Sequence, residues 1–176
     1  MAERANFQTW VLRALFLGLV LAILLHGLLP LDVGAPRIPG PDLILCLVLA
    51  WVQRRPDVLT APLIAGTILL ADFLLMRPPG LWAVLVLIGS EVLRRRAYRA
   101  EATPIVLEMG IVTVAIAGMM IAQRLILTIL FVDQPPVTAE MLHFLTTVAA
   151  YPVVAVASVY VFGIRAHTGD DGGLRT

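Results

Sequence analysis

The sequence predicts an all-α membrane protein, a polytopic six-helix bundle, and three observations lead to this expectation. Of the 176 residues, 60% are hydrophobic and 14% are charged, against roughly 45–50% and about 25% in soluble domains. The mean hydropathy is +0.92. The apolar residues fall into separate blocks bounded by Arg, Pro, Asp or Gly. We therefore expect one transmembrane domain over residues 1–165 and a disordered cytoplasmic tail over residues 166–176.

Six blocks are candidate membrane spans. A helix needs on the order of 20 residues to cross a hydrocarbon core of about 30 Å. The second and fourth blocks are short for this task, so we expect caps, local bilayer thinning or packing inside the bundle to complete them. Prolines separate several of the blocks, since Pro lacks the amide that a helix needs. The six blocks cover approximately residues 13–31, 38–53, 58–76, 80–93, 103–132 and 140–164.

The distribution of arginine predicts the orientation. All of the 13 cationic residues are arginines. With six spans, both termini lie on one side of the membrane, and the positive-inside rule places the arginine-rich side in the cytoplasm. The terminus side would carry Arg4, Arg13, Arg54, Arg55, Arg94, Arg95, Arg96, Arg99, Arg165 and Arg175, against Arg37 and Arg77 on the other side. We expect a multi-pass inner-membrane protein with cytoplasmic termini.

Two charges lie deep inside apolar blocks. Asp72 is part of TILLADFLLMRPPG, residues 67–80, and Arg124 lies in the outer half of the fifth block. An unpaired buried charge is strongly destabilising, so we expect Asp72 and Arg124 to pair across the bundle. A binding or transport role, and extension of Asp72 toward Arg77 or water, are the alternatives. The pair predicts that Asp72→Asn and Arg124→Gln together cost less than the sum of their separate losses.

Other acidic residues have simpler interpretations. Asp42 follows a proline at the start of the second block, where a carboxylate caps free backbone amides, so helix initiation explains it, with binding as the alternative. Glu91 precedes Arg94 and Arg95 by three and four residues, a spacing that allows ion pairs on a helix. Glu108 is expected to reach the cluster of arginines at residues 94–99.

The strongest charge cluster is RRRAYRAEA, residues 94–102. Its basic side chains are Arg94, Arg95, Arg96 and Arg99. Their first role is topogenic, and attraction to anionic lipids follows at about 1 kcal/mol per basic residue near the surface. Docking of a cytoplasmic partner is the alternative.

Motifs of known chemistry do not occur in the sequence. There is no phosphate-binding GxxxxGK[ST], no zinc-binding HExxH and no GxSxG. The one cysteine, Cys46, lies in an apolar run and is expected to be a small buried side chain. Acidic residues are scattered singly over different blocks. We expect no enzymatic activity, catalytic residue, cofactor, metal or nucleic-acid partner.

Two stretches resemble a known family. PDLILCLVLAW at residues 41–51 and IAGTILLADFLLMRPPGLWAVLVLIGSEVLRRR at residues 64–96 are similar to the rod shape-determining protein MreD of bacteria, particularly proteobacterial forms. The shared features are the Pro-Asp-Leu opening of the second block and an aspartate followed by a Pro-Gly turn, here Asp72 and then Pro79 and Gly80. The resemblance covers residues 39–96, and chain length and span count agree over the rest.

The resemblance implies a noncatalytic scaffold or regulator of the cell-elongation complex, which makes lateral peptidoglycan and sets cell shape. The implied partners are MreC, MreB, RodA and its penicillin-binding transpeptidase. The implied fold is similar to the substrate-binding subunits of energy-coupling-factor transporters. A subunit that binds a vitamin or metabolite for transport is therefore the alternative.

Two further observations favour the scaffold. The small residues of 110–118 and 149–158 suit close helix packing with other proteins. A transporter subunit needs an enclosed pocket with convergent polar groups. The outer halves of the six blocks supply few polar side chains beyond His26, Asp72, Gln123 and Arg124.

Overall fold

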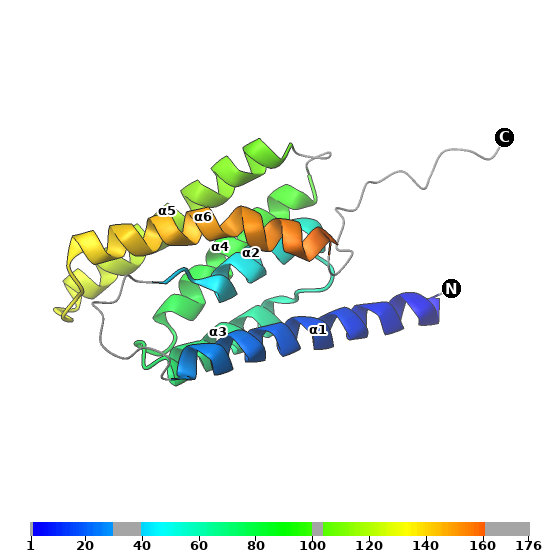
Figure 1. Cartoon of the computed structure of the whole chain (residues 1–176), viewed down its shortest axis with the longest axis horizontal. Helices are drawn as coiled ribbons and strands as arrows, with labels where there is room; N and C mark the ends of the chain where they lie inside the picture. The colour runs from blue at the N-terminus through cyan, green and yellow to red at the C-terminus, as the bar shows by residue number, and fades with distance from the viewer. Residues whose placement is uncertain (1, 30–39, 100–103, 161–176) are drawn as a thin grey trace.

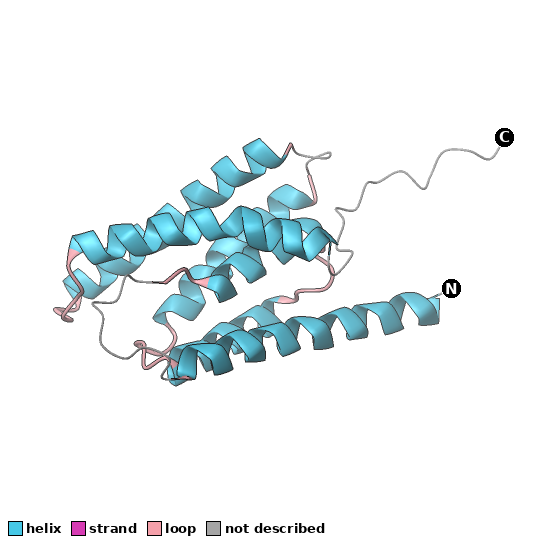
Figure 2. Cartoon of the chain, in the orientation of Figure 1, coloured by secondary structure: helices cyan, strands magenta, loops and turns pink. Residues whose placement is uncertain are grey.

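A computed structural model describes residues 2–29, 40–99 and 104–160, and within these ranges all regular structure is helical (Figure 1, Figure 2). The prediction of an all-α fold with six helices is confirmed. The expected tail at residues 166–176 lies outside the described residues. The helices are α1 (Ala2–Leu28), α2 (Leu43–Arg54), α3 (Ala61–Leu74), α4 (Leu81–Ala97), α5 (Ile105–Ile129) and α6 (Val137–Tyr160).

Three of the helices are long and apolar enough to cross a membrane. These segments are Phe7–Leu28 in α1, Val106–Ile129 in α5 and Val137–Tyr160 in α6. The 12 residues of α2 and the 14 residues of α3 extend only about 18 Å and 21 Å at 1.5 Å per residue. Length and composition therefore support a membrane crossing for three helices, although the sequence predicted six spans.

The helix α3 is shorter than the expected span of residues 58–76, because the chain begins it only at Ala61. Val58 and Leu59 are fully buried although they belong to the connection from α2 to α3. Their carbonyl groups are satisfied by two arginines. Arg13 Nε donates to Val58 O at 2.9 Å, and Arg94 Nη2 donates to Leu59 O at 2.5 Å. Apolar side chains can therefore fill the core from a loop, since its buried backbone is paired.

The helices run alternately in opposite directions. Figure 1 shows the starts of α1, α3 and α5 and the ends of α2, α4 and α6 at one end of the bundle. We call this the basic end because it holds Arg54, Arg55 and the arginines of residues 94–99. The opposite end holds the turns from α3 to α4 and from α5 to α6. The described arginines that the sequence assigned to this side, on α1, α2 and α4, lie toward this end of the bundle, and Arg165 and Arg175 lie outside the described residues.

The helix α2 forms the centre of the bundle and contacts α1, α4 and α6. Every residue from Ile44 to Val52 is buried, which is the pattern of a helix surrounded by other helices. Trp51 is fully buried and packs against Phe16 of α1, with ring centroids 5.5 Å apart. The expectation that Cys46 is a buried side chain is confirmed.

The outer surface is strongly apolar. Large hydrophobic side chains are exposed along both α1 and α5, where a soluble domain of this size would place polar ones. A surface of this kind is typical of helices that face hydrocarbon. The exposed set includes Phe7, Trp10, Leu21 and Leu25 on α1, and Val106, Val114, Ile121, Leu125 and Ile129 on α5.

Candidate functional site

The turn between α3 and α4 explains why an aspartate lies in an apolar block. Asp72 is fully buried, and its Oδ2 accepts hydrogen bonds from the amides of Gly80 at 3.2 Å and Ala83 at 3.4 Å. Gly80 is the N-cap residue of α4 with a φ of +91°, a conformation that favours glycine but provides no capping side chain. Asp72 supplies the missing oxygen from the preceding helix, and its own carbonyl accepts from the amide of Arg77 at 2.9 Å.

A second carboxylate, Asp42, ties this turn to α2 and α6. Its Oδ1 accepts from the amide of Leu45 at 3.0 Å, which confirms the predicted role in starting the helix. Its Oδ2 forms an ion pair with Arg77 Nη1 at 3.1 Å. Its own amide donates to Thr147 Oγ1 on α6 at 3.1 Å. Asp42 and Asp72 therefore both hold helix starts at the end of the bundle opposite the basic end.

The predicted pair of Asp72 and Arg124 is wrong. Arg124 Nη1 is paired with Glu140 Oε2, and this contact joins α5 to α6. The sequence places Asp72 and Arg124 at a similar depth, but depth does not determine which way a helix faces. In the structure α3 packs on α1 and α4, whereas α5 packs on α4 and α6. We therefore expect the losses caused by Asp72→Asn and Arg124→Gln to be additive.

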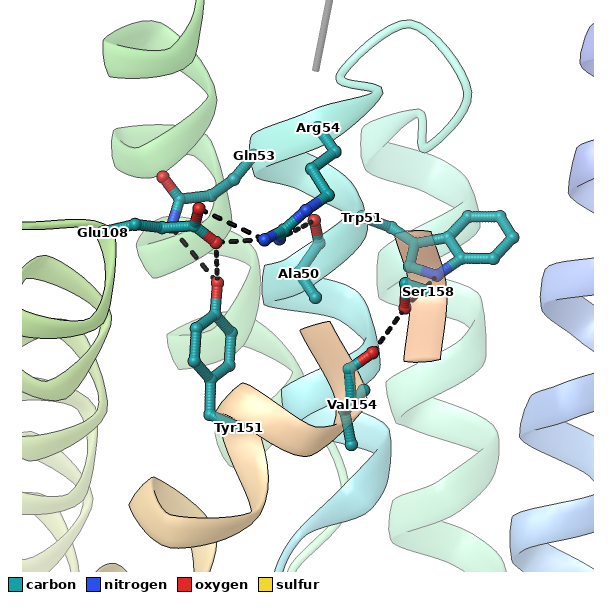
Figure 3. A network of polar contacts seen from close by, with 8 residues as sticks. All are labelled: Ala50, Trp51, Gln53, Arg54, Glu108, Tyr151, Val154 and Ser158. Carbon is teal, nitrogen blue, oxygen red and sulfur yellow. Dashed lines mark hydrogen bonds and ion pairs between the residues drawn. The ribbon is translucent and has the colours of Figure 1, made fainter. Parts of the chain in front are cut away.

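A buried ion pair lies toward the basic end, between α2 and α5 (Figure 3). Arg54 is 7% exposed. Its guanidinium contacts both carboxylate oxygens of Glu108, at 2.7 Å and 3.2 Å, and also donates to Ala50 O at 3.2 Å. The Tyr151 hydroxyl of α6 donates to Glu108 Oε1 at 2.5 Å. Glu108 thus pairs with Arg54, and the expected pairing with the arginines of residues 94–99 is wrong.

Further polar contacts join α2 to α6 beside this pair (Figure 3). Trp51 Nε1 donates to Ser158 Oγ at 3.2 Å, and the serine hydroxyl donates to Val154 O at 2.7 Å. Gln53 Nε2 lies 3.5 Å from the Tyr151 hydroxyl. The segment 149–158 was expected to offer small residues to another protein. Tyr151, Ala155 and Ser158 are instead buried, and the serine and tyrosine face α2.

The basic cluster divides into an inward and an outward part. The predicted pairs of Glu91 with Arg94, at 3.0 Å, and with Arg95, at 3.3 Å, are confirmed. Arg94 is turned inward, and its side chain is 12% exposed. Arg95, Arg96 and Arg99 are exposed. Of the four arginines expected to form a docking surface, three are accessible.

Two features bear on small-ligand binding in the part of the chain that the structure describes. It contains no group of three or more His, Cys, Asp and Glu side chains able to hold a metal ion. A groove of about 200 Å³ between α1 and α3 is lined almost entirely by apolar side chains, among them Leu17, Leu21, Leu63 and Leu70. Its chemistry suits hydrocarbon better than a polar metabolite.

The polar clusters at the two ends of the bundle share a property. Their charged groups contact helix termini, loop carbonyls and one another, so the arrangement serves to hold helices together. Comparisons with family models, curated proteins and solved structures found no match to this chain.

Proposed function

We propose that this chain is a multi-pass inner-membrane protein, with both termini in the cytoplasm, that acts as a noncatalytic scaffold of the bacterial cell-elongation complex. One observation carries the proposal. Among the described residues, most buried polar side chains contact other helices or turns of the same bundle. The outer surface of α1 and α5 is apolar, and α5 offers open small residues to other helices. A protein built in this way acts through its surfaces.

The membrane placement is supported by three long apolar helices and by the arginines of the basic end. Cytoplasmic loops carry an excess of arginine and lysine, so the basic end would face the cytoplasm. The shorter α2 needs no contact with lipid, because it lies at the centre of the bundle. Its buried position lets the surrounding helices shield it where it is too short to span the bilayer.

The clearest surface for a partner helix lies on α5. Gly110, Val114 and Gly118 follow one another at intervals of four residues, and Val114 is 72% exposed. A Cβ atom added to either glycine would meet no other atom within 4 Å. By contrast, Gly89 of α4 already receives Met119 of α5. Small residues let two helices approach closely in a membrane. The two glycines, eight residues apart on either side of Val114, therefore leave this face of α5 open to a partner helix.

The identity of the complex comes from the resemblance of residues 39–96 to MreD. Its partners would be MreC, RodA and the penicillin-binding transpeptidase in the membrane and, through the basic end, MreB in the cytoplasm. The alternative, a vitamin- or metabolite-binding transporter subunit, would use a polar pocket. The groove between α1 and α3 is apolar, so we favour the scaffold.

Affinity purification tests the proposal. The tagged full-length chain would be purified from its native membrane in mild detergent, and the proteins that accompany it identified by mass spectrometry with an untagged control. A second sample carries Gly110→Leu and Gly118→Leu, which fill the open face of α5. A matched control carries Gly18→Leu and Gly66→Leu, since these helical glycines are equally open.

We expect the unmodified chain and the matched control to recover MreC, RodA and the transpeptidase, and the α5 variant to lose them. Equal recovery of these partners by all three samples would show that the open face of α5 does not bind them. Recovery of ATP-binding-cassette ATPases with a membrane coupling subunit would replace the scaffold by the transporter subunit.

A further inference from the structure

Most arginines at the basic end are already engaged. Arg54 is paired with Glu108, and Arg55 is paired with Asp57 at 3.2 Å. Arg13 and Arg94 donate to loop carbonyls, as described above. In contrast, Arg96 and Arg99 have no carboxylate partner among the described residues, and both side chains are exposed. Two guanidinium groups at the end of α4 are therefore free to bind an anion.

These two arginines continue an apolar stripe on α4. Val84, Ile88 and Val92 lie four residues apart and are 53%, 57% and 62% exposed. Residues three and four positions after Val92 fall on or beside the same face of a helix, and these positions are Arg95 and Arg96. Arg99 lies in the turn just after the end of α4 at Ala97, where its amide donates to Arg96 O at 2.9 Å. One side of α4 is therefore apolar over several turns and cationic at its end.

An aromatic side chain borders the cationic part. Tyr98 is 65% exposed and lies between the free arginines in the sequence. Tyrosine is enriched where hydrocarbon meets the headgroup layer, because its ring is apolar and its hydroxyl is polar. The level of Tyr98 is therefore the level expected for lipid headgroups.

We propose that Arg96 and Arg99, with the exposed Arg95 beside them, bind the headgroup of an anionic phospholipid whose acyl chain lies along Val84, Ile88 and Val92. The guanidinium group suits this role because its planar fork donates two hydrogen bonds to phosphate. The proposal rests on the membrane placement above, since the stripe must face hydrocarbon.

Two other ligands fit part of this surface less well. A free phosphate ion would use the arginines but leave the apolar stripe unexplained. An acidic cytoplasmic protein would likewise have no contact with Val84 and Ile88, which lie about 18 Å and 12 Å before Arg96 along the helix axis at 1.5 Å per residue. A phospholipid covers both parts at once.

Lipid binding by variants tests the proposal. The purified full-length chain would be titrated in detergent with phosphatidylglycerol or with phosphatidylcholine of the same acyl chains, and the bound lipid counted by native mass spectrometry. The test variant carries Arg96→Gln and Arg99→Gln. The control variant carries Arg55→Gln and Arg175→Gln, which remove the same formal charge from one arginine that is already paired and one near the chain end.

We expect the unmodified chain to prefer phosphatidylglycerol, and the test variant to lose on the order of thirtyfold of this preference, at about fivefold per arginine. The control variant should keep most of it. An equal preference in the unmodified chain and the test variant would overturn the proposal. Displacement of the lipid by inorganic phosphate at constant ionic strength would also overturn it. So would a test variant that loses protein partners in the affinity purification but still binds phosphatidylglycerol as the unmodified chain does.

Extraction with alkaline carbonate separates this inference from the proposed function. If the unmodified chain leaves the membrane, the membrane placement itself fails. If it stays but shows no lipid preference, only the lipid site fails. Because Arg96 and Arg99 are exposed and have no carboxylate partner within residues 2–29, 40–99 and 104–160, the unfolding temperature of the test variant should equal that of the unmodified chain.

Discussion

Removal of Arg54 offers the sharpest test of how the bundle is held together. Arg54→Met keeps most of the side-chain length but removes the charge that contacts both oxygens of Glu108, at 2.7 Å and 3.2 Å. The side chains of Arg54 and Glu108 are only 8% and 12% exposed, so water cannot replace the guanidinium. The carboxylate would keep the Tyr151 hydroxyl as its partner. Breaking one side of a buried pair costs about 3–5 kcal/mol in unfolding free energy.

A double-mutant cycle checks the origin of this loss. Glu108→Leu alone leaves Arg54 buried and unpaired, and should also cost about 3–5 kcal/mol. The double change Arg54→Met with Glu108→Leu replaces the pair by apolar side chains, and should cost less than the sum of the two by about 2–3 kcal/mol. Unfolding would be followed by tryptophan fluorescence in mixed micelles with a rising fraction of dodecyl sulfate.

An exposed pair serves as the matched control. Arg55 and Asp57 are 24% and 50% exposed, so Arg55→Met should change the unfolding free energy by about 1 kcal/mol or less. Additive losses at Arg54 and Glu108 would refute the reasoning, as would a loss at Arg55 as large as that at Arg54.

Three further predictions concern orientation, the turn after α3 and helix contact. A cysteine that replaces Phe131, which is 95% exposed at the opposite end, should react with an impermeant maleimide in cells with a permeabilised outer membrane. A cysteine that replaces Tyr98 should react only after the inner membrane is opened. The reverse pattern would show the opposite orientation. Asp72→Leu should lower the unfolding free energy by about 2 kcal/mol through loss of the α4 cap, with Asp72→Asn closer to the unmodified chain, and equal losses would show that charge matters more than capping. Gly89→Leu should lower the unfolding temperature in detergent because Met119 occupies that space, while Gly118→Leu should leave it unchanged. Equal changes in unfolding temperature for the two variants would contradict this prediction.

Local interactions could be predicted from the sequence. The helix start at Asp42 follows from an aspartate after proline, and the pairs of Glu91 follow from spacings of three and four residues. The number of helices follows from the prolines and charges that separate the apolar blocks. Each of these features depends on neighbours within one or two turns, so it does not require knowledge of how helices are arranged.

Contacts between distant helices could not be predicted in the same way. Glu108 lies near the start of α5, at the same end as several arginines. Only the packing of both α2 and α5 against α6 brings Arg54 to it. Asp72 and Arg124 share a depth but face different neighbours. One signal was available in the sequence: a helix that begins after Pro79-Gly80 has no capping side chain of its own, and Asp72 is the nearest preceding carboxylate.

Site-specific photocrosslinking at Val114 tests the scaffold most directly, because this residue lies between Gly110 and Gly118 on the open face of α5. A photoreactive amino acid would replace Val114 in one sample and Leu21, an exposed residue of α1, in another, and crosslinked proteins would be identified by mass spectrometry. The account predicts a crosslink from position 114, absent from position 21, to a membrane subunit of the elongation complex such as MreC or RodA. Crosslinks to lipid alone at position 114, or to subunits of a transporter, would contradict it.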